Sequence, residues 1–519
     1  MLSLRRATTP FARVAGSATS TSAAAQPPVI RVPRRAQERA GRGSSGRVAT
    51  TKPGRTLISC KLPQFNQSAG FTPGRFEETR LCSRGWKHSR SSGDHFTVNS
   101  TRAVAHDAGP REPTFGALRV HADLVEALRR AGVVRPTWVQ RQLVPKLLRG
   151  HNVLCAAETG SGKTLAYLLP VLHRLREAGR PEPDAETRAA ILVPSRELAD
   201  QVASVARALG RPVGLTVGLV GGGRGVGAIK AAFAGGRPDV LVATPGALLK
   251  ALWRNYVRLD ALNFVVVDEA DTMFDPSFSG MLGKVLTQTH ISENPSDLRG
   301  PTPKAQLVVV GATFPGGVGD VLDKVTDLGS MLTIRSQMLH FLLPHVKQTF
   351  LKVKGADKLL ELSEALKRAE REGAAVLVFC NSASTVNWLG YSLGELGVRH
   401  ARLQGGMPAA MREGVFRSFQ KGLASVLVCT DIASRGLDTQ RVRLVVNYDF
   451  PETQTDYIHR VGRVGRAGGQ MEGEALSFVT HPWDVELVQK IEAAARKRTC
   501  LPGMETGNWR PGLKAATDN

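Results

Sequence analysis

Short apolar runs alternate with helix-length amphipathic stretches from about residue 112 onward. A first series reads VLCAA, AAILVP, LTVGLV, DVLVAT, NFVVVDEA and QLVVVGAT, and a second reads AAVLVFCN, SVLVCTD, RLVVNYD and ALSFVT. Apolar runs of this length, separated by helical patterns, are typical of buried parallel strands joined by crossover helices. The pattern therefore predicts two tandem α/β domains with parallel sheets, over residues 111–335 and 348–490.

The stretch between the two series predicts a linker. Residues 336–347 contain Pro344 and carry no strong helical period, so a regular element is not expected there. Residues 491–519 follow the last apolar run, and we expect them to form a short tail.

The N-terminal region lacks this alternation. Residues 1–30 are rich in Arg, Ser and Ala and contain no acidic residue, which is the composition of a mitochondrial transit segment and indicates the matrix. Residues 31–110 remain rich in Arg, Gly and Ser and are predicted to be a disordered basic arm. RVPRRAQERAGRGSSGR also fits a nuclear address or an RNA-binding arm, so a nuclear or nucleolar pool stays open as an alternative.

Charge adds a candidate partner. The 519 residues carry a formal net charge of +24, and the first 105 hold 18 Lys and Arg against four Asp and Glu. Such a balance favours a polyanion, most simply nucleic acid, although a targeting segment plus a solvated basic surface also fits. No apolar run of membrane-spanning length occurs, and no C-x-x-C pair supports a zinc or redox site. We expect a monomeric core.

VLCAAETGSGKT predicts a phosphate-binding loop between a strand and a helix. Gly160 and Gly162 allow backbone N–H groups to face a phosphate, Lys163 would reach the β- and γ-phosphates, and Thr164 would hold Mg²⁺. The loop itself comprises Ala157, Glu158, Thr159, Gly160, Ser161 and Gly162. The alternative is a tight turn without a ligand.

Two further motifs complete the candidate chemistry. In FVVVDEADTMF, Asp268 and Glu269 end a strand, where Asp268 would hold the metal and Glu269 would activate the attacking water. The alternative is an acidic first turn of a helix. In YIHRVGRVGRAG, Arg460, Arg463 and Arg466 recur every third residue and would act on phosphate as arginine fingers do, or else form a solvated or RNA-binding face.

These three elements, in this order, resemble the DEAD-box family of RNA helicases. The signature tetrapeptide stands as Asp268-Glu269-Ala270-Asp271. The resemblance spans roughly residues 112–485 and includes PTWVQ, AETGSGKT, VPSRELADQ, a Gly222-Gly223 pair, TPG, VFCNS, CTDIASRGLD and VNYD. It implies two tandem RecA-like domains, preceded by a disordered basic region, that bind ATP and Mg²⁺ and act on RNA.

The resemblance also implies roles for individual residues. Gln140 would read the adenine edge, Phe115 would stack on the base, and Asp438 would contact the ribose. Catalysis is implied for Lys163, Asp268, Glu269, Arg463 and Arg466. RNA-backbone contacts are implied for Pro194, Ser195, Arg196, Gly223, Thr244, Gly246, Asn381, Arg412 and Thr430. Coupling between the domains is implied for Asp271, Gly311, Ala312, Thr313, His459 and Arg460.

The chain departs from the family pattern at three places. The usual Ser-Ala-Thr is Gly311-Ala312-Thr313, which removes a hydrogen bond worth about 0.5–1.5 kcal/mol. Ala247 follows TPG where arginine is usual, and Ala409 replaces glutamine. We therefore expect ATP hydrolysis with weaker coupling to strand separation and a weaker RNA grip, which the basic arm would offset.

The leading hypothesis is an ATP-dependent RNA helicase that remodels structured RNA. The transit-like N-terminus and short tail resemble a vertebrate mitochondrial member of the family linked with large-ribosomal-subunit assembly. That resemblance implies ribosomal RNA and mitoribosomal assembly proteins as partners. One alternative is an ATP-gated RNA clamp or scaffold with weak or no unwinding, and another is a DNA helicase.

Overall fold

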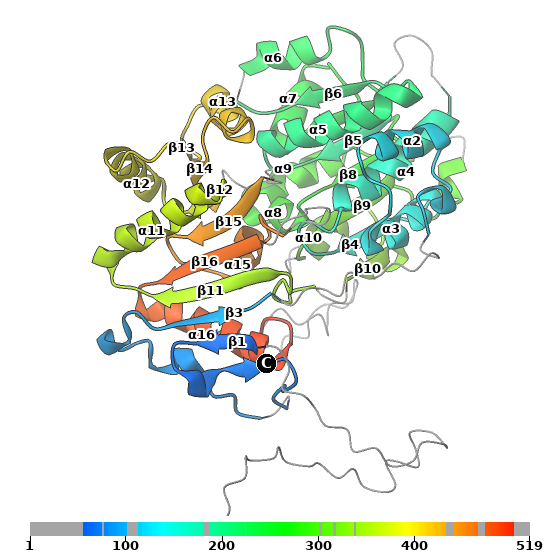
Figure 1. Cartoon of the computed structure of the whole chain (residues 1–519). Coiled ribbons are helices and arrows are strands. Elements are labelled where there is room, and N and C mark those ends of the chain that lie inside the picture. The colour runs from blue at the N-terminus through cyan, green and yellow to red at the C-terminus, as the bar shows by residue number, and fades with distance from the viewer. Residues whose placement is uncertain are drawn as a thin grey trace, which may run out of the picture. The chain divides into compact units, whose positions relative to one another are not determined.

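Two sheets, each carrying parallel strands, organise the chain (Figure 1). The computed structural model describes residues 56–74, 77–100, 113–179, 186–223, 225–299, 304–314, 318–336, 339–431, 441–465 and 473–502. The predicted transit segment, residues 1–30, lies outside the described residues. No helix in these ranges combines the length and apolar character needed to cross a membrane.

The first sheet has seven strands in the order β10-β4-β9-β8-β5-β7-β6, and all pairs are parallel. The strands are β4 (Val153–Ala156), β5 (Ala189–Leu192), β6 (Val217–Val220), β7 (Val240–Ala243), β8 (Phe264–Val267), β9 (Gln306–Gly311) and β10 (Leu332–Arg335). The helices are α2 (Ala122–Arg130), α3 (Trp138–Leu148), α4 (Lys163–Glu177), α5 (Arg196–Gly210), α6 (Gly225–Ala232), α7 (Pro245–Trp253), α8 (Ala270–Met273), α9 (Pro276–Leu286) and α10 (Val318–Leu322).

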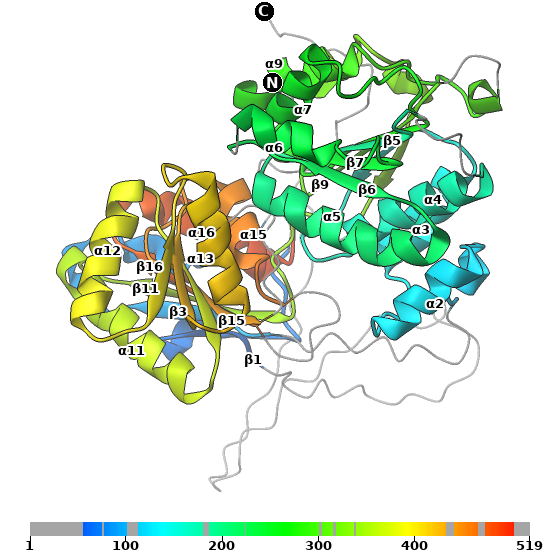
Figure 2. The ribbon, with the colours of Figure 1, turned by 90° about the horizontal axis from the view of Figure 1, so that it is seen from above.

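Helices cover both faces of this sheet. Alternate residues of each strand enter different hydrophobic clusters: Val266 packs with α2 to α5, whereas Val265 and Val267 pack with α7, α9 and α10. Figure 2 shows α3, α4 and α5 on one side of these strands and α7 and α9 on the other. The near-continuous apolar runs in the sequence follow from burial on both faces.

The second sheet has nine strands in the order β13-β14-β12-β15-β16-β11-β3-β1-β2. Its parallel strands are β11 (Val346–Lys352), β12 (Ala375–Phe379), β13 (His400–Leu403), β14 (Val426–Cys429), β15 (Val442–Asn447) and β16 (Gly473–Val479). Its helices are α11 (Lys358–Arg371), α12 (Ala383–Glu395), α13 (Ala409–Gln420), α15 (Gln454–Val461) and α16 (Pro482–Lys497). The predicted fold class, two tandem α/β domains with parallel sheets, is confirmed.

Three antiparallel strands from the N-terminal region extend the second sheet. They are β1 (Thr56–Cys60), β2 (Gln67–Ser68) and β3 (His95–Val98). β3 pairs with β11 and β1 pairs with β3, and Figure 1 shows the blue strands beside β11. The prediction of a disordered arm over residues 31–110 is therefore wrong for residues 56–74 and 77–98. The strands are short, and β3 joins the sheet through β11, about 250 residues further along the chain, so local patterning did not reveal them.

Side chains fix this segment to the second domain. Trp86 and Phe96 are buried, and the Phe96 ring stacks on Phe350 of β11 with centroids 4.6 Å apart. The backbone N–H of Ser83 and its hydroxyl both donate to the Glu492 carboxylate of α16, at 3.0 and 2.5 Å. Strand pairing, ring packing and hydrogen bonds thus make residues 56–74 and 77–98 a folded part of that domain.

The domain also extends further at its C-terminal end than predicted. Helix α16 continues to Lys497, and Ile491 and Ala494 are buried in the domain core. The predicted tail over residues 491–519 is therefore wrong for its first seven residues. Between the sheets, β10 ends at Arg335 and β11 begins at Val346, on either side of most of the predicted linker.

Replacement of Trp86 by alanine should destabilise the second domain by about 3–5 kcal/mol, because it removes a fully buried aromatic side chain from the core. Chemical denaturation followed by circular dichroism measures the loss. Trp388→Ala is the matched control, since that side chain of α12 in the same domain is 52% exposed and its removal should change stability little. Equal effects of the two substitutions would contradict the assignment of Trp86 to a core.

Candidate ATP site and RNA interface

The predicted ATP-site motifs meet at one edge of the first sheet. Ala157 follows β4, Asp268 follows β8 and Ala312 follows β9, and these strands are neighbours in the order β4-β9-β8. Because all three strands are parallel, their carboxyl ends lie at the same edge, where open α/β sheets bind ligands. The structure thus brings together the phosphate loop, the acidic tetrapeptide and the Gly-Ala-Thr segment.

The phosphate loop has the backbone that a phosphate cradle needs. Gly160 and Gly162 have φ angles of +80° and +86°, which lie in the left-handed region that glycine adopts without strain. Gly162 immediately precedes α4, so the positive end of the helix faces the loop. Lys163 Nζ donates to the carbonyls of Ala157 and Glu158 at 2.7 and 3.0 Å, which places the ammonium group over the loop.

Gln140 ties the start of α3 to this loop. Its Oε1 accepts from the backbone N–H of Thr137 at 2.8 Å, and its Nε2 donates to the carbonyl of Gly162 at 3.1 Å. Thr137 Oγ1 donates to the Ser161 carbonyl at 2.8 Å. Phe115 is buried in the core of the first domain. The adenine contacts of Gln140 and Phe115 stay predictions.

A buried tyrosine holds the first acidic residue. Tyr167 Oη donates to Asp268 Oδ2 at 2.9 Å, and the other carboxylate oxygen accepts from the backbone N–H of Glu269 at 2.8 Å. Burial and the neighbouring Glu269 raise the pKa of Asp268 to about 7, and burial raises the pKa of Tyr167 well above its usual range. Tyr167 therefore remains a hydrogen-bond donor that fixes the orientation of this carboxylate.

Glu269 adopts a strained backbone conformation. Its φ of +51° and ψ of +55° place a non-glycine residue in the left-handed region, at the N-cap of α8. Such strain costs about 1–3 kcal/mol and concentrates at functional sites. The two acidic side chains differ in burial: Asp268 is 4% exposed, whereas Glu269 is only half-buried.

The donor set at this edge fits Mg²⁺. Thr164 supplies a hydroxyl and Asp268 a carboxylate, and Tyr167 contacts both side chains. Hard oxygen donors suit Mg²⁺, which in nucleotide sites typically takes one or two carboxylates and completes its shell with phosphates and water. No cluster of three or more His, Cys, Asp or Glu with metal-binding geometry occurs among the described residues.

Gly311 packs so tightly against the acidic tetrapeptide that a side chain there would require its neighbours to shift. A Cβ added at this position would lie 3.0 Å from both the Ala270 Cβ and the Thr313 carbonyl oxygen. The Gly311 carbonyl meanwhile accepts from the backbone N–H of Ala157 at 3.0 Å, which fixes its place beside the phosphate loop. The position that lacks the usual serine hydroxyl is therefore one where a side chain would have little room.

Gly311→Ser should destabilise the first domain by about 1–3 kcal/mol, since overpacking forces neighbouring atoms apart. Gly311→Ala separates packing from hydrogen bonding, because it adds the Cβ without the hydroxyl. We expect both variants to melt at lower temperature, and the serine variant to unwind more duplex per ATP than the alanine variant. Unchanged melting in both would contradict the close approach.

The RNA-backbone residues predicted for the first domain lie along the same edge. Pro194 and Ser195 follow β5, Thr244 and Gly246 follow β7, and Gly223 follows β6, and these strands are adjacent in the order β5-β7-β6. Ser195 and Thr244 are N-caps of α5 and α7. Two helix N-termini and a glycine turn thus present backbone N–H groups that suit phosphates. Arg196 is mostly buried and donates to the Gly222 carbonyl at 3.2 Å.

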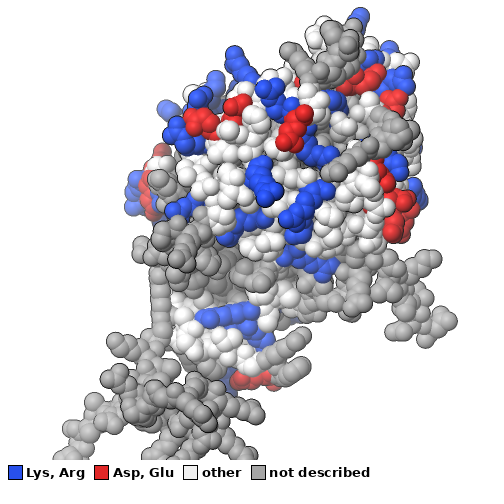
Figure 3. All heavy atoms as spheres, turned by 90° about the vertical axis from the view of Figure 1, so that its right-hand side faces the viewer, with Lys and Arg blue, Asp and Glu red and all other residues white. Residues whose placement is uncertain are grey.

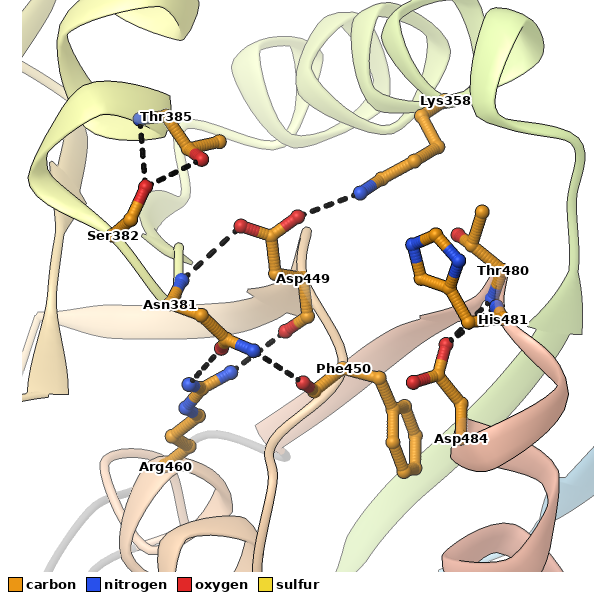
Figure 4. A network of polar contacts seen from close by, with 10 residues as sticks. All are labelled: Lys358, Asn381, Ser382, Thr385, Asp449, Phe450, Arg460, Thr480, His481 and Asp484. Carbon is orange, nitrogen blue, oxygen red and sulfur yellow. Dashed lines mark hydrogen bonds and ion pairs between the residues drawn. The ribbon is translucent and has the colours of Figure 1, made fainter.

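One predicted RNA-contact residue of the second domain, Asn381, belongs to a polar network (Figure 4). The Asn381 side chain accepts a hydrogen bond from Arg460 at 2.6 Å and donates to the Phe450 carbonyl at 3.0 Å. The Asp449 carboxylate accepts from the Asn381 backbone N–H and from Lys358 Nζ. Thr430 lies at the end of the neighbouring strand β14. Arg412 of α13 lies 3.5 Å from Glu197 of α5, so its predicted RNA contact stays a prediction.

Arg460 was predicted to bridge the two domains, but its hydrogen bonds to the described residues stay within the second domain. Its guanidinium donates to both carboxylate oxygens of Asp431, at 2.7 and 2.6 Å, to the Asp449 carbonyl and to Asn381. All of these partners belong to the second domain, and the side chain is 1% exposed. A bidentate, buried guanidinium of this kind organises the loops that follow β12, β14 and β15.

His459 and Gly462 make contacts with the first domain. His459 Nε2 lies 2.8 Å from Asp271 Oδ2, with both side chains buried. Burial opposes protonation of His459, but the Asp271 carboxylate outweighs it and holds the pKa of His459 above its usual range. A Cβ at Gly462 would overlap Thr159 of the phosphate loop. Arg463 donates to the His459 carbonyl at 3.1 Å, whereas Arg466 and Asp438 lie outside the described residues.

Sequence reasoning missed several residues that position this site. Tyr167, Asp431 and Asp449 each hold a predicted functional side chain or its backbone through the hydrogen bonds described above. Tyr167 falls within an apolar helical pattern, where an aromatic residue is ordinarily core. The carboxylate of Asp449 follows the strand-like run RLVVNY, and that position at a strand end was a usable signal.

Comparisons with known proteins agree with this geometry. The family model described as DEAD/DEAH box helicase matches residues 137–321, and the helicase conserved C-terminal domain matches residues 357–468. The chain is 52% identical over 503 residues, 93% of each chain, to the mouse (Mus musculus) protein named probable ATP-dependent RNA helicase DDX28. It is 35% identical over 390 residues, 74% of this chain and 90% of the relative, to the ATP-dependent rRNA helicase RRP3 of Encephalitozoon cuniculi.

Among solved structures, the S. cerevisiae Dbp5 bound to RNA and ADP BeF3 is similar. Its TM-score is 0.61 at 26% identity, covering 74% of this chain and 93% of that one. The shared fold, the matched family models and the high identity to complete helicases all point the same way. This chain belongs to the DEAD-box family of ATP-dependent RNA helicases.

Proposed function

We propose that this helicase remodels ribosomal RNA during assembly of the mitochondrial large ribosomal subunit. The acid-free, Arg- and Ser-rich pattern of residues 1–30 supports import into the matrix. The net charge of +24 supports a polyanionic partner, and the rRNA helicase among the relatives supports ribosomal RNA as the substrate class. Mitoribosomal assembly proteins would be the protein partners.

The observation that carries the RNA-remodelling function is the arrangement of the two sets of motifs on the first sheet. Nucleotide residues follow β4, β9 and β8, and RNA-backbone residues follow the adjacent strands β5, β7 and β6. A phosphate backbone recognised through helix N-termini carries no sequence information, so the helicase would bind structured RNA by shape and charge. Figure 3 shows Lys and Arg side chains spread over one face, with acidic ones mostly towards its margins.

The residues present assign the tasks of the ATPase cycle. Lys163 binds the β- and γ-phosphates, and Thr164 and Asp268 would hold Mg²⁺, which when bound neutralises charge on the transferring phosphoryl group. Glu269 orients the attacking water and accepts its proton. His459 and Asp271 connect the second domain to the acidic tetrapeptide, so ATP and RNA would favour the same closed state and raise each other's affinity.

A second candidate function is an ATP-gated RNA clamp with weak or no unwinding. Gly311 favours it, because a position that links the phosphate loop with the tetrapeptide carries no hydroxyl. An RNA-stimulated ATPase assay beside a duplex-unwinding assay separates the two functions. ATP turnover without strand release supports the clamp, and turnover with strand release supports the helicase. Activation by DNA as strong as that by RNA would support a DNA substrate instead.

Crosslinking in cells tests the substrate. Ultraviolet crosslinking of the full-length protein, followed by sequencing of the bound RNA, should recover mitochondrial large-subunit ribosomal RNA. The Glu269→Gln variant is the informative companion, because blocked hydrolysis should trap RNA and increase the recovered amount. Recovery dominated by nuclear transcripts would contradict the mitochondrial assignment and support a nuclear or nucleolar pool.

A further inference from the structure

The N-terminal segment on the second domain brings two cysteines together. Cys60 ends β1 and Cys82 begins the 3-10 turn η2 (Cys82–Gly85), and both residues contact the same Arg496–Glu492 ion pair of α16. Both side chains are partly exposed, and the structure records both as thiols. The pair could not be predicted from the sequence, because the two residues are 22 positions apart and form no C-x-x-C motif.

An ion pair of α16 holds the two cysteines in different environments. Arg496 Nη2 lies 2.7 Å from Glu492 Oε1, and both side chains are buried. The same nitrogen donates to Cys60 Sγ at 3.6 Å, whereas Glu492 accepts from the backbone N–H of Cys82 at 2.9 Å. Cys60 Sγ thus lies between the Arg496 guanidinium and the Phe65 carbonyl, to which it donates at 3.5 Å, whereas Cys82 is anchored beside a carboxylate.

These environments shift the pKa values of the two thiols in opposite directions. The hydrogen bond from Cys82, reinforced by Arg496, holds the pKa of Cys60 below its usual range despite partial burial. The same hydrogen bond, burial and Glu492 raise the pKa of Cys82. A thiolate beside a cation attacks, and a neighbouring thiol resolves the product. By contrast, Cys155, Cys380 and Cys429 are fully buried.

We propose that Cys60 and Cys82 form a thiol pair that a low-molecular-weight disulfide converts into an intramolecular disulfide. The Cys60 thiolate attacks one sulfur of glutathione disulfide, which releases one glutathione thiolate and forms a mixed disulfide. Cys82 then loses its proton and attacks the Cys60 sulfur, which releases the second glutathione. Two protein thiols and one glutathione disulfide thus give one protein disulfide and two glutathiones.

The disulfide would fasten the N-terminal segment within its own fold. Residues 61–81 lie between the two cysteines, and the chain on either side carries β1 and the Ser83 contacts with Glu492. Closing this loop restricts the unfolded chain and so stabilises the segment on the sheet. Oxidation would therefore strengthen the attachment of β1 to β3, which pairs with β11, without touching the ATP site.

The test exposes the full-length protein to buffers of reduced and oxidised glutathione, followed by alkylation and peptide mapping. We expect a Cys60–Cys82 disulfide and a higher melting temperature for the oxidised protein. Cys82→Ser should stop at a glutathione adduct on Cys60, and Cys60→Ser should leave Cys82 unmodified. Neither variant should change the basal ATPase rate.

Cys500→Ser is the matched control, because Cys500 is also partly exposed but lies outside this pair. That variant should oxidise and gain melting temperature as the parent protein does. An adduct that forms on Cys82 in the Cys60→Ser variant as fast as on Cys60 would overturn the proposal. So would glutathione adducts on both cysteines of the parent protein without a disulfide between them.

Discussion

Glu269→Gln should lower the rate of RNA-stimulated ATP hydrolysis by about 10²- to 10⁴-fold, which is the usual contribution of a general base. Glutamine keeps the shape of the side chain but cannot accept the proton of the attacking water. ATP and RNA binding should persist, because the phosphate loop and the RNA-facing helix ends are untouched. Single-turnover hydrolysis, with nucleotide binding measured by fluorescence, gives both quantities.

The backbone at position 269 allows the Glu269→Gln variant to be compared with the parent protein without a change in strain. Glu269 and its glutamine replacement carry the same strain at φ +51°, so the free energy of unfolding should be unchanged. Glu293→Gln, an exposed glutamate elsewhere in the first domain, controls for the loss of one negative charge. A Glu269→Gln variant that hydrolyses ATP at the parent rate would show that another group activates the water.

The sheets and the chemistry of their edges could be predicted from the sequence because both depend on residues that lie close together along the chain. FVVVDE combines an apolar run with two carboxylates, and β8 indeed ends where Asp268 begins. Parallel topology then places every such strand end on the same edge. Gly160 and Gly162 adopt the left-handed conformations that a phosphate loop requires. These features needed no knowledge of distant contacts.

Features that depend on long-range pairing could not be predicted in the same way. TLISC pairs with HFTV, and HFTV joins the sheet only through β11 and the Phe96–Phe350 ring contact, about 250 residues further along the chain. Arg460 belonged to a regular arginine series, yet Asp431 and Asn381 bind it within its own domain. Gly311 was recognised as a lost hydroxyl, whereas its close packing against Ala270 required coordinates.

Arg463→Ala should lower the rate of ATP hydrolysis by about 10³- to 10⁵-fold, if this residue supplies the arginine that stabilises the transferring phosphoryl group. Position supports the assignment: Gly462, its neighbour, approaches Thr159 of the phosphate loop, and Arg463 follows the His459 contact with Asp271. The loss should appear in kcat, since the group acts on charge that develops during the reaction. Steady-state kinetics at saturating RNA measures it.

Two companions separate this role from a structural one. Arg463 is 3% exposed and donates to the His459 carbonyl, so the alanine variant must also be tested for its melting temperature. Arg463→Lys retains the charge without the planar fork and should recover part of the rate. Arg417→Ala removes an exposed arginine of α13 and should leave hydrolysis unchanged. Equal losses of stability and of rate in Arg463→Ala and Arg463→Lys would contradict this role. They would mean that Arg463 supports the fold of the loop and that another arginine completes the site.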